Sequence, residues 1–126
     1  HPTIPIEDLL LSKLQIVEPS DRDIRDILAM LNDHPVEADP DTEAIDPTYV
    51  ASLCKGDWGL YRTLTLNLDR IEEYVDDADL PIEASRITGR TGALREAIES
   101  EPKTLRWKLR SLVGERKQWY DQPELT

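Results

Sequence analysis

Lys13 interrupts the apolar face of a predicted helix. At about 100° per residue, this lysine falls within an arc of aliphatic residues, namely Ile6, Leu9, Leu10 and Val17. An unpaired ammonium is costly to bury, so the amine must reach solvent, pair with an acid or face an anion. A phosphate or carboxylate from a neighbouring domain would suit the last of these three positions.

Two carboxylates, Asp23 and Asp26, stand three residues apart on the next predicted helix. Arg22 precedes Asp26 by four residues, the spacing of a favourable ion pair on a helix. Ser20 and Asp23 have the spacing of a capping box, with Asp where Glu or Gln is usual. The pattern is therefore typical of a capped, solvated helix start, and the alternative is a pair of carboxylates in a functional site.

A basic segment near the C-terminus, residues 103–117, is the third candidate. It has six basic side chains and one acidic one in a chain of net charge −11, and Trp119 and Tyr120 follow it. Basic side chains neutralise phosphates and aromatic faces stack on bases, so one reading is an RNA or single-strand contact. The other reading is that the segment docks on the protein's own acidic loops, with its tryptophans in the core. The candidate nucleic-acid contacts are Lys103, Arg106, Trp107, Lys108 and Arg110.

The elements that position these groups are helices, because the apolar residues recur at helical rather than strand spacing. Proline, glycine and capping residues place the breaks between them. We therefore predict an all-α fold, a compact bundle or subdomain of five or six helices in one domain over residues 1–126. The predicted helices cover residues 6–17, 20–31, 47–53, 58–75, 82–98 and 103–113, with acidic connections at 32–46 and 76–81.

Composition argues against several classes of protein. The excess of acidic over basic side chains, 26 against 15, argues against a surface that binds nucleic acid throughout. No apolar run approaches the roughly 18 residues of a membrane span, so no membrane association is expected. The single cysteine, Cys54, excludes an internal disulfide and favours a reducing, cytoplasmic compartment.

No self-sufficient active site is expected within these residues. The chain has no glycine-rich phosphate loop, no His and Cys spacing that would bind a metal, and no nucleophile elbow. His1 and His34 have no evident role as a base. The chain begins at His1 rather than at a methionine, and we expect it to be part of something longer.

The opening stretch resembles a known family of enzymes. The segments IPIEDLLLSKLQIVE at residues 4–18 and DRDIRDI at residues 21–27 resemble the C-terminal helical region of nucleotidyltransferase-like proteins. These proteins belong to the polymerase-β-type superfamily, near the AbiEii group. The similarity continues over residues 57–65 and 101–108, and it is weakest in the acidic loop and over residues 76–92.

The resemblance implies a nucleotide-binding role for four residues. An Asp-x4-Lys motif of the family matches Asp8 and Lys13, and a later Arg-Asp-x-x-Asp motif matches Arg22, Asp23 and Asp26. In such proteins the lysine meets the triphosphate and the later aspartate supports the nucleotide site. The implied reaction is nucleotidyl transfer, in which an acceptor attacks the α-phosphate with metal assistance and pyrophosphate leaves.

The same resemblance assigns the metal and the nucleotide to another part of the intact protein. Mg²⁺ and a nucleoside triphosphate would bind an α/β nucleotidyltransferase core that is absent from these residues. The implied partners are that missing N-terminal core and an RNA, tRNA or protein acceptor. We therefore expect the 126-residue chain to hold no metal and to be inactive alone.

Two other functions remain open at this point. One is a non-catalytic protein-interaction or dimerisation module, in which exposed helix faces bind a partner or a second copy. The other is an RNA-binding domain that uses residues 103–120.

Overall fold

The computed structural model describes three stretches of the chain, residues 5–37, 44–77 and 84–119. Within them the regular structure is helical, apart from one isolated bridge between Val36 and Ile45. The prediction of an all-α fold with five or six helices is confirmed for these stretches. The elements are α1 (Ile6–Leu14), α2 (Asp21–Asp33), α3 (Pro47–Cys54), α4 (Trp58–Asp77), α5 (Ala84–Ser100), α6 (Leu105–Val113) and a 3-10 turn, η1 (Gly114–Arg116).

Some predicted features lie outside the described residues. They include residues 38–43 of the first acidic connection, residues 78–81 of the second, and Tyr120.

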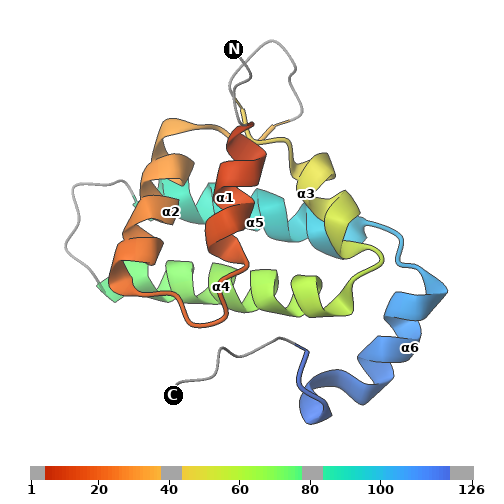
Figure 1. Cartoon of the computed structure of the whole chain (residues 1–126). Helices are drawn as coiled ribbons and strands as arrows, with labels where there is room; N and C mark the ends of the chain where they lie inside the picture. The colour runs from red at the N-terminus through yellow and green to blue at the C-terminus, as the bar shows by residue number, and fades with distance from the viewer. Residues whose placement is uncertain (1–4, 38–43, 78–83, 120–126) are drawn as a thin grey trace.

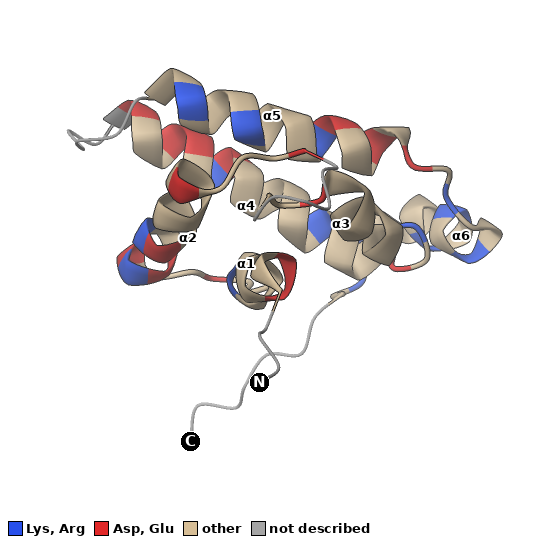
Figure 2. Cartoon of the chain, turned by 90° about the horizontal axis from the view of Figure 1, so that it is seen from above, with Lys and Arg blue, Asp and Glu red and all other residues tan. Residues whose placement is uncertain are grey.

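The helices form a body of five with the sixth set to one side (Figure 1). The two longest helices, α4 and α5, lie side by side, and α1, α2 and α3 pack against this pair (Figures 1 and 2). Among the described helices, α6 contacts α4 only. The largest fully buried side chains come from the five-helix body: Leu10, Leu14, Ile27, Leu28, Leu31, Ile45, Leu64, Leu68, Ile71, Ile87, Leu94 and Ile98.

The start of α2 follows the predicted capping pattern. The Asp23 backbone N–H donates to Ser20 Oγ, and the Ser20 backbone N–H donates to the Asp23 carboxylate. Two backbone N–H groups that have no partner within the helix are thereby satisfied, which fixes where the helix begins. The predicted stripe on this helix is also confirmed, with Ile24, Ile27 and Leu28 among its buried residues.

The first helix is shorter than predicted, because it ends at Leu14 rather than at Val17. Two side chains of α4 donate hydrogen bonds to the carbonyl groups at and just beyond the end of α1. The Asn67 amide donates to the carbonyls of Leu14 and Ile16, at 2.5 and 2.7 Å, and Arg70 donates to the Val17 carbonyl at 2.6 Å. These hydrogen bonds satisfy the carbonyls without a further helical turn, so the chain can leave the helix early.

The fifth helix continues through both of its glycines. We predict it over residues 82–98, weakened by Gly89 and Gly92. In the structure Ala84–Ser100 is one helix, and both glycines lie on its exposed side. Burial of the opposite side, which includes Ile87 and Leu94, offsets their low helix propensity.

The sixth helix begins at Leu105, two residues after the predicted start. The Thr104 hydroxyl accepts a hydrogen bond from the Trp107 backbone N–H and so caps the helix at this point. Its end is as predicted, at Val113. Gly114 follows with a φ of 59°, a left-handed conformation that favours glycine.

None of the helices in the described stretches is both long and apolar enough to cross a bilayer. The longest of them, α4, shows why. One side of it is buried through Leu64, Leu68, Ile71 and Val75, and charged residues occupy the other side.

We expect Asn67→Ala to lower the free energy of unfolding by about 2–3 kcal/mol. Asn67 is 1% exposed, so its loss leaves two carbonyls beside it without this donor and removes one of the two acceptors of Arg70. Urea unfolding measures the change. The matched control is Asn32→Ala, because the side-chain amide of Asn32 has only exposed partners. This substitution should lower the free energy of unfolding by less than about 1 kcal/mol. An equal effect of the two substitutions would contradict the role given to Asn67.

Candidate functional site

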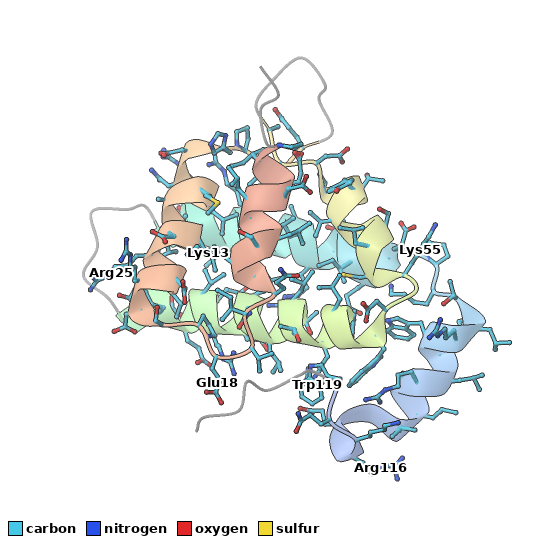
Figure 3. All side chains as sticks on the ribbon, in the orientation of Figure 1. Lys13, Glu18, Arg25, Lys55, Arg116 and Trp119 are labelled. Atoms are coloured by element: carbon cyan, nitrogen blue, oxygen red, sulfur yellow. The ribbon has the colours of Figure 1, made fainter. Side chains whose placement is uncertain are left out.

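Lys13 pairs with two carboxylates of its own chain. It lies in the last turn of α1, between this helix and α2 (Figure 3). Its Nζ is 3.0 Å from Asp23 Oδ1 and 3.3 Å from Asp26 Oδ2. The side chains of Lys13 and Asp23 keep 32% and 21% of their exposure. Of the three positions open to this amine, pairing with an acid is the one observed.

Asp23 is the more firmly held of the two carboxylates. Its Oδ2 accepts hydrogen bonds from the backbone N–H and the hydroxyl of Ser20, both at 3.0 Å, and its Oδ1 accepts one from Lys13. The Ser20 backbone, followed by Lys13, lowers the pKa of Asp23 below the usual 3.8. Hydrogen bonds to Asp23 and Asp26 raise the pKa of Lys13 above the usual 10.5. At neutral pH the lysine and Asp23 are therefore fixed in their charged forms.

The remaining residues of the two motifs lie apart from this cluster. The Tyr49 hydroxyl donates to Asp8 Oδ1 at 2.8 Å, which ties α1 to α3 and raises the pKa of Tyr49. The predicted ion pair between Arg22 and Asp26 is wrong, because Asp26 pairs with Lys13 instead. Arg22 is exposed. Three of the four candidate nucleotide-binding residues thus converge, and Asp8 does not join them.

The cluster by itself does not fit Mg²⁺ or a triphosphate. Mg²⁺ needs free oxygen ligands, whereas both oxygens of Asp23 already accept hydrogen bonds. A triphosphate needs an excess of positive charge, and here two carboxylates outnumber one ammonium. Within residues 5–37, 44–77 and 84–119, no group of three or more His, Cys, Asp or Glu side chains is placed to hold a metal ion. The implied Mg²⁺ and nucleotide would need further ligands from the rest of the intact protein.

The basic segment uses Lys103 to fasten the connection between α5 and α6. Lys103 Nζ donates to the carbonyls of Ile98 and Glu101, at 2.5 and 2.6 Å. The same amine lies 5.4 Å from the ring centroid of Trp107 and 5.8 Å from that of Tyr61. A cation over aromatic faces is attracted by the ring quadrupole, so this lysine serves packing within the protein.

Arg110 is also committed internally. It donates to the carbonyls of Gly114 and Lys117, each at 2.8 Å, and its guanidinium lies 4.8 Å from the ring centroid of Trp58. The reading in which the segment docks on acidic loops is wrong for Lys103 and Arg110, because backbone carbonyls and aromatic rings are their partners. Its other half is also wrong, because Trp107 and Trp119 are only half-buried and lie outside the buried core.

Trp107 is held against the protein and does not present its ring for stacking on a base. Its ring meets Tyr61 edge to face, with centroids 5.1 Å apart. Its indole N–H is buried and has no acceptor among the described residues. Of the five candidate nucleic-acid contacts, Arg106 and Lys108 are therefore the two whose side chains are exposed and unengaged.

A cleft of about 400 Å³ opens between α6 and the start of α4. The rings of Trp58 and Trp119, which meet edge to face at 5.7 Å, form part of its wall, and Asp57, Arg106 and Arg110 contribute polar groups. Arg110 is already satisfied and Asp57 is acidic, so Arg106 is the one unengaged cation in the described lining. The cleft could hold one anionic group, which is too little to define a ligand.

The outward face of α6 is apolar, and sequence analysis did not single it out. Its exposed side chains are Leu105 at 72%, Leu109 at 57%, Leu112 at 71% and Val113 at 39%. The signal was their spacing of four, three and one residues, which places them on one side of a helix. Such spacing normally predicts a buried face, and periodicity alone does not tell whether a neighbour covers it. We call these four residues the α6 stripe.

Unengaged cations gather beside this stripe. Arg106 and Lys108 lie about 80° to either side of its centre, at about 100° per residue, and Lys117 follows the helix. The side chains of these three residues have no hydrogen-bond, ion-pair or ring partner among the described residues, and those of Arg22 and Lys55 are the other two cationic side chains of that kind. Figure 2 shows basic residues and no acidic ones on α6.

The described groups whose pKa values are clearly shifted are held in unreactive forms. Burial raises the pKa of the Cys54 thiol to about 12, and burial with a hydrogen bond to Glu99 raises the pKa of Tyr61 to about 12. The other resolved shifts, in Lys13, Asp23, Arg25 and Tyr49, also lead away from neutral pH. General acids and bases need a pKa near the working pH, and none of these shifts supplies one.

Comparison of the chain with protein-family models, curated proteins and solved structures finds no significant match. The nucleotidyltransferase-like resemblance thus stays an expectation drawn from the residues at 4–27, 57–65 and 101–108. The two surfaces of the molecule that bear on function are the Lys13 cluster and the α6 stripe.

We expect Asp23→Asn to lower the melting temperature at about pH 7, and we expect this effect to shrink as the pH falls below 3.8 and to be small once the pH is below the lowered pKa of Asp23. The lowered pKa of Asp23 contributes stability above the ordinary carboxyl value of 3.8, and this contribution is lost as the pH falls through the lowered pKa. Thermal unfolding at several pH values measures the difference from the unaltered chain. Asp76→Asn, at an exposed position on the same molecule, is the control. A difference that stays constant down to about pH 2 would show that the charge of Asp23 is irrelevant to stability.

Proposed function

We propose that the chain is a non-catalytic protein-interaction module, whose helical body holds α6 for contact with another protein. The observation that carries this proposal is the α6 stripe, in which Leu105 and Leu112 are each more than 70% exposed. Singly scattered exposed apolar residues are normal on a protein surface. A contiguous stripe with a charged edge is typical of a protein-binding surface.

The way α6 is attached supports the proposal. No residue of this helix is buried, so it adds little to the core. Its inner side is nevertheless fixed, because Trp107 packs on Tyr61 and Arg110 packs on Trp58. A helix held by one side and uncovered on the other presents its apolar face in a defined orientation, which lowers the entropic cost of binding.

The absence of chemical activation in the described stretches favours a binding role. The thiol of Cys54 and the hydroxyl of Tyr61 are kept protonated, and Lys13 and Asp23 are neutralised by each other. None of these four groups is poised as a nucleophile or as a general acid or base.

We expect a photo-crosslinking residue at position 109 of the full-length protein to capture a distinct protein in the cells that make it. The same residue at position 53 is the control, because Leu53 is 40% exposed on α3 and is not part of the stripe. The captured protein is identified by mass spectrometry, purified and titrated with the chain. Leu109→Gln should weaken its affinity about tenfold, a loss of about 1.4 kcal/mol, because an apolar anchor becomes polar.

Two results bear directly on that expectation. Leu109→Gln should leave the free energy of unfolding within about 0.5 kcal/mol, because the side chain is exposed. If Leu53→Gln weakens binding as much as Leu109→Gln does, or if neither weakens it, the stripe is not the binding surface and the proposal is wrong.

The convergence of Lys13, Asp23 and Asp26 favours a second candidate function. The chain would then be the C-terminal helical domain of a nucleotidyltransferase-like protein, with this cluster lining one side of its nucleotide cleft. The support is that Asp23 and Asp26, which follow Lys13 by 10 and 13 positions, both lie within 3.3 Å of its amine on a partly exposed surface. In that role the amine of Lys13 would have to leave one of its aspartate partners and pair with a phosphate of the nucleotide.

We expect Lys13→Ala to weaken nucleotide binding by the full-length protein at least about tenfold if this second function holds. A lysine beside phosphates contributes a point charge whose loss lowers affinity. Calorimetric titration with ATP and Mg²⁺ measures the effect, and Lys55→Ala is the control at an exposed, unengaged lysine. Unchanged affinity in Lys13→Ala would leave the lysine as an ion-pair partner of α2 alone.

A further inference from the structure

We propose that the partner of α6 presents an apolar surface edged by Asp and Glu side chains, an inference that rests on the proposed protein-interaction function. The α6 stripe supplies the apolar half of the contact. Arg106 on one side and Lys108 on the other supply two cations that are exposed and have no partner among the described residues. An acidic amphipathic helix, or an apolar groove with an acidic rim, complements this arrangement on both counts.

The distribution of cations supports this choice of partner. Elsewhere in the described stretches most lysines and arginines are committed to the chain's own groups, as with Lys13 on Asp23 or Arg95 on Asp69 and Glu72, and Arg22 and Lys55 are the exceptions. The two that flank the stripe are left open, although the chain as a whole has an excess of acids. Free cations at the edge of an apolar stripe select acidic neighbours and repel basic ones.

A second copy of this chain fits the surface poorly. Pairing of two α6 stripes would bring Arg106 and Lys108 of one copy beside those of the other, and like charges placed together oppose association. Docking of the stripe onto the acidic body of another copy would be a head-to-tail contact, which either closes into a ring or grows without limit. The net charge of −11 on each copy also opposes association.

RNA and anionic lipid are also poor matches. The centre of the exposed face is leucine, whereas single-stranded nucleic acid needs open aromatic faces, and the ring of Trp107 is packed on Tyr61. Both ligands are polyanions, and the chain outside α6 has a negative net charge that would repel them. A protein surface with a limited acidic rim avoids this repulsion, because it can meet α6 alone.

The test uses two synthetic helical peptides of about four turns that share one leucine stripe. Glutamates flank the stripe in one peptide and lysines flank it in the other. Fluorescence anisotropy measures the binding of each labelled peptide to the full chain. We expect the Glu-flanked peptide to bind at least about tenfold more tightly, and we expect this advantage to shrink as salt screens the charges.

Variants of the chain separate the apolar contribution from the charged one. Leu109→Gln with Leu112→Gln should abolish binding of both peptides. Arg106→Gln with Lys108→Gln should remove the preference for the Glu-flanked peptide and keep the residual apolar binding. The matched control is Leu53→Gln with Lys55→Gln, an exposed leucine and lysine at the end of α3, which should change neither. Circular dichroism checks that every variant stays folded.

Each other outcome overturns the acidic-rim inference. If the two peptides bind equally and the stripe variant abolishes both, the interaction module stands and the charge argument is wrong. If neither peptide binds but position 109 still captures a protein, the partner has a different chemistry. If neither peptide binds and position 109 captures nothing, the proposed function fails as well. Tighter binding to phosphatidylserine vesicles or to RNA would show that the ligand of α6 is a lipid surface or a nucleic acid rather than an acidic protein. A dimer mass that the stripe variant removes would show that the partner is a second copy of the chain.

Discussion

The satisfaction of backbone carbonyls at helix ends is the constraint on which this bundle depends. The last carbonyls of a helix have no intrahelical donor, and a buried carbonyl without a donor is costly. Side chains from neighbouring helices meet this need at the ends of α1 and α2, and a side chain of the connection between α5 and α6 meets it at the end of α5. Asn67 and Arg70 of α4 donate hydrogen bonds to carbonyls at and just beyond the end of α1. Arg90 of α5 donates to the carbonyls of Leu31 and Asn32 in α2, and Lys103 donates to carbonyls at the end of α5. These hydrogen bonds fix where each helix stops and how it is oriented to its neighbour.

The same constraint decides which cations are available for function. In a chain with 15 basic side chains against 26 acidic ones, carboxylates are numerous enough to pair with every cation. Instead Arg70, Arg90, Lys103 and Arg110 are held by carbonyls, where they also complement the negative ends of helix dipoles. The exposed cations that remain are few, and Arg106 and Lys108 flank an uncovered apolar face. The position of the remaining charge is therefore a by-product of how the helices are capped.

Features that depend on neighbouring residues in sequence could be predicted, and those that depend on distant residues could not. The capping box of Ser20 and Asp23 and the buried stripe of α2 need only residues within two turns. The early end of α1 depends on Asn67, more than 50 residues away, and the partner of Asp26 is Lys13 rather than the nearer Arg22. Periodicity placed the leucines of α6 on one face, but only the packing of α6 on α4 shows that this face is the uncovered one.

The charge arrangement limits where a partner can sit as well as what it can be. An acidic partner is drawn to Arg106 and Lys108 and repelled by the remainder of the chain, which carries the negative net charge. Such a partner gains nothing by spreading from α6 onto the five-helix body. The contact is then confined to one helix of nine residues, about 13 Å long, which corresponds to a small interface. Small interfaces of this kind favour transient binding whose rate is set by electrostatic steering, so the ionic strength around the protein would control how often the partner is engaged.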